Sequence, residues 1–365
     1  MKILVIFGTR PEAIKMCPLI LELKKEKLIQ CCICLTGQHR EMLKQVMDVF
    51  RIKADYDLDI MTSEQTLSGI AIRILENLER IIKGENPDLI LVHGDTSTSF
   101  VASLAGFYAG IPVGHVEAGL RTYNMKSPYP EEFNRQAVDL MAELYFAPTD
   151  TARGNLLREG KHADKIFVTG NTVIDALKTT VIRNYENEHL EWATDSRLVL
   201  FTAHRRENLG QPMRNMFRAL KRIVQNFPDV KVIYPIHKNP KVREIAGEIF
   251  TDLERIRVIE PLDVIDFHNF MARSDLILTD SGGVQEEAPS LGKPVLVMRD
   301  TTERPEGVDA GTLKLVGTQE ETIYQETKRL LSDEQEYERM SKAANPYGDG
   351  HASEKIVQII LRRML

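Results

Sequence analysis

The sequence lacks the long apolar runs that mark membrane proteins and the basic stripes that mark nucleic-acid binders. Its longest apolar runs, such as ILVIF and LVLF, are far shorter than the roughly 20 residues that span a bilayer. The run after Met1 and Lys2 is also too short for the core of a signal peptide, and it ends in GTRPE. The 53 acidic and 47 basic residues are spread along the chain and give a net charge of −6. We therefore expect a cytoplasmic protein that binds neither membranes nor nucleic acid.

Several cofactor signatures are missing as well. The turn after the first apolar run reads Gly-Thr-Arg-Pro, without the Gly-x-Gly-x-x-Gly of dinucleotide-binding proteins, and no Gly-Lys-Ser/Thr phosphate loop occurs. The histidines lack regular ligand spacing and no His-Glu-x-x-His is present, so we expect no bound metal. No second Cys or His cluster accompanies the four cysteines, which we predict to be reduced thiols of the core. They are Cys17, Cys31, Cys32 and Cys34.

The sequence does contain a repeated alternation of short Val-, Ile- and Leu-rich runs with helix-length segments. In the first half these runs are KILVIFG, CCICLTG, LILVHGD, PVGHVEA, LYFAPT and IFVTG. In the second half they are LVLFTAH, KVIYPIH, IRVIEP, LILTD, VLVMRD and LKLVG. Continuous apolar strands that alternate with helices are typical of parallel sheets covered on both faces. Because 365 residues exceed the usual size of one domain, we predict an α/β protein with two doubly wound domains.

The domain boundary is expected where strand character is lost. Between Gly170 and Arg197 the chain becomes polar, and near its end NPYGDG interrupts the pattern. An amphipathic helix follows, with Ile356, Ile360 and Leu361 on one side. We predict a first domain over 1–170, a second over 171–351, and a terminal helix over 352–365 that packs back on the first.

In open parallel sheets ligands bind beyond the carboxyl ends of the strands, so charged residues at these positions are site candidates. Arg10 and Lys15 follow the first strand and could serve an anion, or could be solvated charges at a helix start. Asp95 could be a catalytic group or a helix N-cap. A carboxylate at the buried strand end of Glu117 is costly unless it is used or paired, which favours a function for it.

Two adjacent acids, Glu131 and Glu132, follow Pro130 at a predicted helix start. The helix macrodipole stabilises acids there by roughly 0.3 to 1 kcal/mol, so their position alone favours a structural role. Asn134 and Arg135 lie on the next turn and could orient either acid.

The second half offers groups suited to an anion. His204 ends a buried strand and begins HRRE, which is typical of a group that handles an anion or a leaving group. Arg205 and Arg206 could instead simply pair with Glu207.

The run DSGGVQEE combines a phosphate-binding turn with two acids. Gly282 and Gly283 let the chain turn closely around a diphosphate, with Ser281 and the first helical N–H groups as donors. Helical side chains lean back toward the N-terminus, so Glu286 or Glu287 could accept hydrogen bonds from a ribose diol. A nucleoside diphosphate would use both features, whereas the alternative is a helix start that merely favours acids.

Eight motifs occur in order from residue 3 to about 353, and together they resemble the non-hydrolysing UDP-N-acetylglucosamine 2-epimerases. They are FGTRPEAIKM, TGQH, HGDT, HVEAGLRT, PEEFNR, HRREN, DSGGVQEEAPSLGKPVLVMRDTTERPEG and NPYGDG. The resemblance implies a glycosyltransferase-B (GT-B) fold, with two Rossmann-like domains, the active site in the cleft between them, and usually a homodimer.

The resemblance also implies an isomerase that interconverts UDP-N-acetylglucosamine and UDP-N-acetylmannosamine for cell-surface polysaccharide synthesis. UDP is eliminated to give 2-acetamidoglucal and is then added back, and no cofactor is needed. Which carboxylate removes the C2 proton and which returns it is left open. Two alternatives share the UDP motifs: a 2-epimerase of another UDP-N-acetyl sugar, and a GT-B glycosyltransferase, which would need an acceptor.

Residue by residue, the resemblance extends the candidate set and reverses the helix-start interpretation of Glu131. It implies that the groups at the reacting sugar and its anion are Arg10, Lys15, Asp95, Glu117, Glu131, Arg135 and His204. It implies that the UDP is bound by Phe267 at the uridine, Glu287 at the ribose, Ser281, Gly282 and Gly283 at the phosphates, and Arg304 nearby.

Bacterial members of this family often bind a second UDP-N-acetylglucosamine as an activator. The resemblance implies that Gln38, Arg205 and His237 belong to this allosteric site. Glu41 and Glu64 occupy two further positions where the family has another polar residue and an arginine. These departures leave activation by substrate open.

Overall fold

The computed structural model describes residues 1–37, 40–61, 66–302 and 304–364, with residues 40–42 and 206 described by their backbone alone. The chain divides into two compact units, Met1–Thr179 with Tyr347–Leu365, and Thr180–Pro346. The sequence had suggested boundaries after residues 170 and 351. The first unit extends further at both places because the Tyr347 carbonyl accepts the Asn171 N–H at 2.7 Å, which ties the two segments together.

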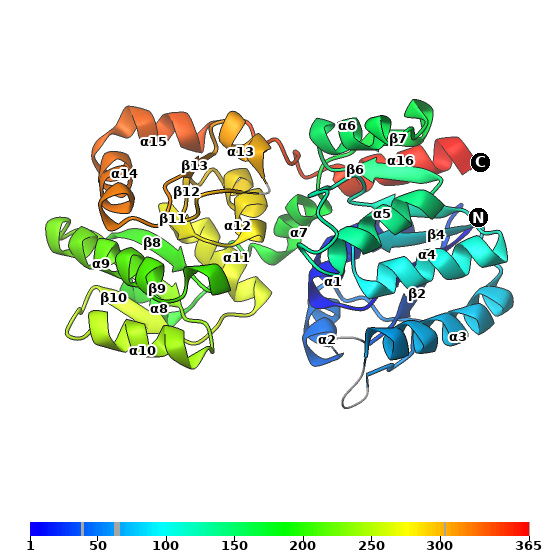
Figure 1. Cartoon of the computed structure of the whole chain (residues 1–365), viewed down its shortest axis with the longest axis horizontal. Helices are drawn as coiled ribbons and strands as arrows, with labels where there is room; N and C mark the ends of the chain where they lie inside the picture. Colours follow the sequence, from blue (N-terminus) through cyan, green and yellow to red (C-terminus); the bar gives the residue numbers. More distant parts are fainter. Residues whose placement is uncertain (38–39, 62–65, 303, 365) are drawn as a thin grey trace. The chain divides into compact units, whose positions relative to one another are not determined.

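The first unit is built around a parallel sheet of seven strands among the described residues, in the order β3-β2-β1-β4-β5-β6-β7. The strands are β1 (Lys2–Phe7), β2 (Gln30–Leu35), β3 (Tyr56–Asp57), β4 (Leu89–His93), β5 (Val113–Val116), β6 (Leu144–Ala147) and β7 (Ile166–Val168). The helices are α1 (Arg10–Lys25), α2 (Arg40–Val49), α3 (Leu67–Glu85), α4 (Ser97–Ala109), α5 (Glu131–Met141), α6 (Asp150–Arg158), η1 (Ala163–Lys165), α7 (Thr172–Thr180) and α16 (Ala352–Met364). Helices cover both faces of this sheet (Figure 1).

The second unit repeats this plan with six parallel strands among its described residues, in the order β10-β9-β8-β11-β12-β13. The strands are β8 (Arg197–Thr202), β9 (Val230–Pro235), β10 (Ile256–Ile259), β11 (Leu276–Thr279), β12 (Val295–Val297) and β13 (Leu313–Leu315). The helices are α8 (Glu188–Trp192), η2 (Arg206–Asn208), α9 (Gln211–Asn226), α10 (Pro240–Ile249), α11 (Val264–Arg273), α12 (Gly282–Glu287), η3 (Ala288–Leu291), α13 (Pro305–Asp309), α14 (Glu320–Ser332) and α15 (Glu334–Ser341). The predicted α/β class with two parallel sheets is therefore confirmed.

Each apolar run quoted from the sequence forms a strand, and burial on both faces explains why these runs are continuously apolar. The sequence missed only β3 among the described strands. This strand has two residues and joins the edge of the sheet through pairing of Tyr56 with Cys34. So short a segment carries no apolar period that a sequence could reveal.

Parallel register brings the carboxyl ends of the central strands to one edge of each sheet. In the first unit His93 of β4 is paired with Val116 of β5, so the segments that follow β4 and β5 emerge side by side. In the second unit Thr202 of β8 is paired with Thr279 of β11, which brings together the segments after these two strands. The candidate residues of both units lie on these segments.

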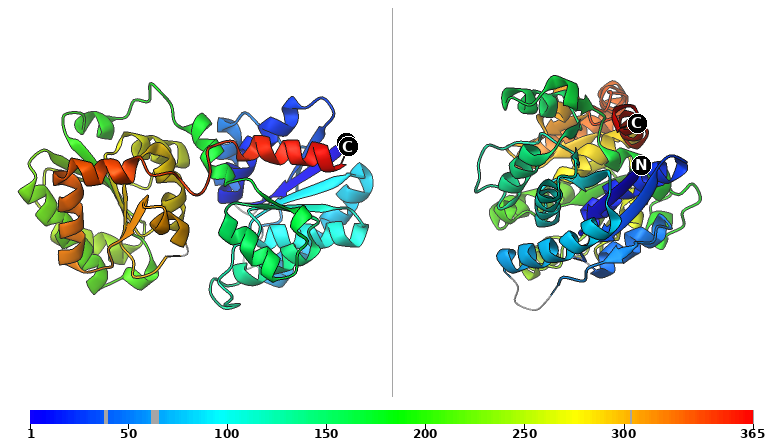
Figure 2. Two further views of the ribbon diagram at one scale, coloured as in Figure 1. Left: turned by 90° about the horizontal axis from the view of Figure 1, so that it is seen from above. Right: turned by 90° about the vertical axis from the view of Figure 1, so that its right-hand side faces the viewer.

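Helix α16 completes the first unit, as its position beside the N-terminal half of the chain shows (Figure 2). It packs on α1, with Ile356 and Ile360 fully buried. Asp175 of α7 caps its start by accepting the N–H groups of Ala352 at 3.2 Å and Ser353 at 2.8 Å. The carboxylate thus satisfies N–H groups that a helix start leaves unpaired.

The four cysteine thiols are free, as the sequence predicted. Cys17, Cys32 and Cys34 are buried, whereas Cys31 is half-buried. Burial raises the pKa of Cys34 to about 12, so this thiol stays protonated and unreactive at neutral pH. No helix within the described ranges has the length and apolar character required to cross a membrane.

Candidate active site

Glu117 follows β5 and is held by an unusual set of neighbours. Its backbone lies in the left-handed region, with φ at 68°, which is costly for a residue other than glycine and often marks a functional site. Its Oε2 atom forms an ion pair with Lys15 Nζ and accepts a hydrogen bond from Asn171 Nδ2 at 3.0 Å. Although burial opposes it, the charges of Lys15 and His93 hold the pKa of Glu117 well below its usual range. Glu117 is therefore an ionised carboxylate at neutral pH.

His93, the last residue of β4, was not singled out from the sequence. Its ring is buried, and its Nε2 atom lies 3.6 Å from Oε2 of Glu117. Neither ring nitrogen has a hydrogen-bond partner within the described residues. The only signal in the sequence was its place beside Asp95 in HGDT, where a histidine could equally be part of the core.

Asp95 is not the N-cap of α4, which was one of the two roles that its position allowed. The cap is Thr96, whose side chain accepts the Ser99 N–H at 3.1 Å. Asp95 instead pairs with Arg135 of α5, and its carbonyl accepts a hydrogen bond from Asn134 Nδ2 at 2.9 Å. The two α5 residues therefore orient Asp95, which the sequence had not predicted. Arg135 Nη1 also lies 3.4 Å from Glu132 Oε2, as the sequence allowed.

The acids at the start of α5 have different surroundings. Glu132 is buried and accepts the backbone N–H groups of Thr122 at 3.0 Å and Tyr123 at 2.9 Å, so the structural role predicted for it is confirmed. Glu131 is half-buried, and its side chain forms no hydrogen bond or ion pair with any residue that the structure describes. Arg10, the first residue of α1, is likewise half-buried without an ion pair in the described part of the chain.

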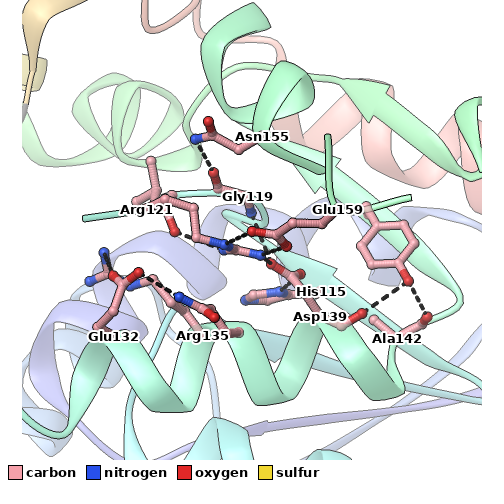
Figure 3. A network of polar contacts seen from close by, with 12 residues as sticks. His115, Gly119, Arg121, Glu132, Arg135, Asp139, Ala142, Asn155 and Glu159 are labelled. Atoms are coloured by element: carbon pink, nitrogen blue, oxygen red, sulfur yellow. Dashed lines mark hydrogen bonds and ion pairs between the residues drawn. The ribbon is translucent and has the colours of Figure 1, made fainter. Parts of the chain in front are cut away.

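A buried network below this edge fixes the segment that carries Asp95. His115 Nδ1 lies 2.6 Å from Asp139 Oδ1 (Figure 3). His115 Nε2 lies 2.8 Å from the Gly94 carbonyl oxygen. Both partners are acceptors, because His115 and Arg121 hold the pKa of Asp139 below its usual range despite burial. Both ring nitrogens therefore donate, and His115 links α5 to the residue before Asp95.

The same network reaches the segment after Glu117. Asp139 Oδ2 accepts hydrogen bonds from the Gly119 N–H at 3.3 Å and from Arg121 Nη2 at 2.7 Å. Arg121 also pairs with Glu159 at 2.7 Å, as Figure 3 shows. Buried charges need such partners, since an unpaired one costs several kcal/mol.

In the second unit the turn after β11 is lined by two arginines. A side chain at Gly282 would lie 3.4 Å from Arg304 Nη1 and 3.6 Å from Arg205 Nη2. Glycine therefore leaves room above the turn while both guanidinium groups converge on it. Arg205 is itself anchored, because its Nε donates to the Asp280 carbonyl at 3.0 Å. It also lies 3.7 Å from Glu207, so the pairing considered from the sequence is present as well.

Glu286, one of the two acids considered for a ribose diol, holds Arg304. Its Oε1 atom accepts Arg304 Nε at 2.8 Å and lies 2.8 Å from Arg304 Nη2. The glutamate is 4% exposed, so the carboxylate of this pair is shielded from solvent. Glu286 thus points the guanidinium of Arg304 toward the glycine turn.

Glu287 leans back over the turn, as expected of a helical side chain. Its Oε1 atom would lie 3.5 Å from a side chain at Gly283, and its Oε2 atom lies 3.4 Å from His268 Nε2. Phe267 precedes this histidine on α11 and is half-buried against the core. The candidates for the ribose and the base are therefore on neighbouring elements of one unit.

His204 and His237 stack in the second unit, with ring centroids 5.9 Å apart. Burial lowers the pKa of His204, although the Asp280 carboxylate opposes this effect. Arg205 and His237, the predicted allosteric residues, are thus placed beside His204. Gln38 and Glu64 lie outside the described residues, as does the side chain of Glu41.

Comparison with known proteins identifies the same family over almost the whole chain. Residues 21–361 match the family model described as UDP-N-acetylglucosamine 2-epimerase. The chain is 61% identical to the UDP-N-acetylglucosamine 2-epimerase of Bacillus subtilis, over 99% of this chain and 95% of that protein.

Two solved structures show the same fold. The S. aureus MnaA structure with UDP is 55% identical, with a TM-score of 0.88 over 99% of this chain and 96% of that one. The Neisseria meningitidis UDP-GlcNAc 2-epimerase bound to UDP-GlcNAc is 48% identical, with a TM-score of 0.89 over 100% of both chains. The predicted GT-B fold is confirmed by these likenesses, and the chain belongs to the UDP-N-acetylglucosamine 2-epimerase family of enzymes.

Proposed function

We propose that this protein interconverts UDP-N-acetylglucosamine and UDP-N-acetylmannosamine by eliminating UDP and adding it back. Besides membership of the family, one observation on this chain supports the proposal. Glu117 is ionised, its Oε2 atom is occupied by Lys15 and Asn171, and its Oε1 atom has no hydrogen bond among the described residues. A desolvated carboxylate with one open oxygen is suited to proton transfer at carbon.

The acids of the first unit act on the proton at C2. Removing this proton while the C1–O bond breaks leaves a 2-acetamidoglucal and UDP. Reprotonation on the other face, followed by the return of UDP, inverts C2. Two proton-transfer groups are needed for the two faces, and Asp95, Glu117 and Glu131 are the candidates. The buried network below them supports this role because it fixes the segments that carry Asp95 and Glu117.

The cations of the second unit stabilise the departing diphosphate. Arg304 and Arg205 converge on Gly282, and the Ser281 hydroxyl and the N–H groups of Gly282 and Gly283 at the start of α12 are further donors for the diphosphate. Fixed cations lower the barrier where negative charge develops, because they need no rearrangement during the reaction. Phe267 and Glu287 bind the base and the ribose, and Arg10 and Lys15 support the anion from the first unit.

One experiment tests this function. The protein is incubated with UDP-N-acetylglucosamine alone in heavy water, and the sugar is followed by proton NMR. Deuterium at C2 together with a manno product is expected. Absence of exchange without an added acceptor would exclude epimerisation and favour a glycosyltransferase.

The proposal includes a cytoplasmic homodimer. Apolar side chains on α4 and α5 support the dimer, since Phe107, Tyr108 and Leu140 are 60%, 71% and 77% exposed. Such side chains on adjacent helices are typical of a surface that another subunit covers. Sedimentation equilibrium that gives the mass of one 41.5 kDa chain would contradict the dimer.

A further inference from the structure

The segment after β8 is organised around one fully buried carboxylate, that of Asp280. This residue follows β11 directly and precedes Ser281 of the glycine turn. Its carboxylate accepts the backbone N–H groups of His204 at 3.0 Å and Arg205 at 2.9 Å, and a third hydrogen bond from Asn208 Nδ2 at 3.0 Å. One carboxylate therefore holds both the anion-binding turn and the segment that carries His204.

The same carboxylate also faces the His204 ring. His204 Nδ1 lies 3.4 Å from Asp280 Oδ1, whereas His204 Nε2 has no hydrogen bond among the residues that the structure describes. A carboxylate beside one ring nitrogen favours the tautomer that carries its proton there. The other nitrogen is then fixed in direction and open to a ligand, since the His204 side chain is 43% exposed.

We propose that Asp280 is a positioning residue that keeps the proton of His204 on Nδ1 and presents Nε2 to the diphosphate. In the protonated ring, Nε2–H donates a hydrogen bond to the departing phosphate oxygen. His237 supports this arrangement from the other face by stacking. Its own Nδ1 accepts the Asn239 N–H at 3.1 Å, so His237 is fixed and does not compete for Asp280. The inference rests on the proposed function only for the identity of the anion.

The tautomer of His204 can be read without any activity measurement. In ¹⁵N-histidine-labelled protein, long-range proton–nitrogen spectra distinguish Nδ1–H from Nε2–H rings, and the signals lost in His204→Gln identify the residue. At a pH where the ring is neutral, we expect Nδ1–H in the native protein and a shift toward Nε2–H in Asp280→Asn. A native His204 in the Nε2–H form would overturn the proposal, whatever the enzyme's activity.

Kinetics separate positioning from a purely structural role. Asp280→Asn is expected to lower kcat on the order of 10- to 100-fold in the native background. In the His204→Gln background the same change should cost less than about threefold, because residues that act through one another are not additive. Equal losses in both backgrounds would show that Asp280 acts independently of His204 and would contradict the proposal.

The pH profile gives a third readout. The charges that face His204 are Asp280 and Glu207, which favour its protonated form, and Arg205 and His237, which oppose it. Removal of the Asp280 charge lowers the pKa of His204 further, so the loss of kcat/KM at high pH should begin about one pH unit lower. If the high-pH limb of the kcat/KM profile were the same in Asp280→Asn as in the native protein, a contact between Asp280 and His204 would be contradicted.

A matched control exists on the same strand. Asp275 lies at the opposite end of β11 and accepts the Leu198 N–H at 2.7 Å. Asp275→Asn also removes a carboxylate that ties β11 to β8, but it should leave the pH profile and the His204 tautomer unchanged. A wild-type enzyme without epimerase activity would refute the proposed function, while the tautomer would still decide the role of Asp280.

Discussion

Ion pairs occur at the carboxyl edges of both sheets, but the acidic and basic members exchange roles between the two units. In the first unit the groups proposed to act on the sugar are carboxylates, and cations hold them: Lys15 holds Glu117, and Arg135 holds Asp95. In the second unit the groups proposed to act on the diphosphate are cations or a histidine, and carboxylates hold them. Glu286 holds Arg304, and Asp280 holds the His204 segment.

This difference shows that the fold does not decide the chemistry of a strand end. Both edges offer buried strand termini, short turns and helix starts. What differs is which member of each pair is proposed to act on the substrate and which holds it in place. A carboxylate suits proton transfer, whereas a cation suits a leaving anion. Substitutions at the two edges should therefore separate turnover from nucleotide affinity.

The largest expected effect is on turnover from the first unit. Glu117→Gln keeps the shape of the side chain but removes the charge that accepts a proton, so kcat should fall on the order of 10²- to 10⁴-fold. UDP affinity, measured by calorimetry, should stay within about threefold because the change affects only the transition state. Glu143→Gln, on an exposed side chain of the same unit, is the control. A parallel loss of UDP affinity would assign Glu117 to binding instead.

The next effect concerns stability of the first unit. Asp139→Asn leaves Arg121 and His115 buried without their shared carboxylate, which should cost about 3 to 5 kcal/mol in the free energy of unfolding at pH 7. Urea denaturation measures this. In the second unit Asp229→Asn removes a carboxylate that is 54% exposed, and should cost at most about 1 kcal/mol.

The pH dependence of this pair has a defined sign. Burial raises the pKa of Asp139, but His115 and Arg121 lower it more, so its pKa is lower in the folded protein than the roughly 3.9 of an unfolded chain. Its contribution is therefore complete above the unfolded value and is lost as pH falls through the folded value. Below about pH 5, the difference in unfolding free energy between native protein and Asp139→Asn should shrink as the pH falls. A difference that widens in acid would contradict this account.

An intermediate effect is expected on nucleotide affinity in the second unit. Arg304→Lys keeps the charge but loses the planar group that contacts Glu286 and reaches Gly282, so UDP should bind about tenfold more weakly. Arg243→Lys changes an exposed arginine of the same unit that pairs with Glu260, and should leave UDP affinity unchanged. If Arg304→Lys lowered kcat at saturating substrate and left UDP affinity intact, it would be wrong to assign turnover to the first unit and nucleotide affinity to the second.

The sequence predicted the strands because a strand buried on both faces is continuously apolar. It predicted the general position of the site because ligands of parallel sheets bind beyond the carboxyl ends of the strands. Apart from local pairs such as Arg205 with Glu207, it did not predict which side chains contact one another. Glu286 and Glu287 are adjacent in the sequence, but only a three-dimensional structure shows that one holds Arg304 and the other faces His268. Asp139 and Asp280 were missed for the same reason, since each acts on a segment distant in the chain.

The smallest expected effect is that of salt concentration, which tests the proposed roles of both sheet edges in one experiment. The Lys15–Glu117 and Arg121–Asp139 pairs have side chains at most 16% exposed, whereas the Arg304 and Arg205 side chains are 23% and 28% exposed. Raising NaCl from about 0.1 M to 1 M shortens the screening length from about 10 Å to 3 Å, and buried pairs are screened much less than exposed charges. UDP affinity should therefore weaken about threefold to tenfold while kcat at saturating substrate changes by less than about twofold. Calorimetry and steady-state kinetics in the same buffers measure the two quantities. A fall in kcat at unchanged UDP affinity would mean that the screened charges belong to the proton-transfer edge.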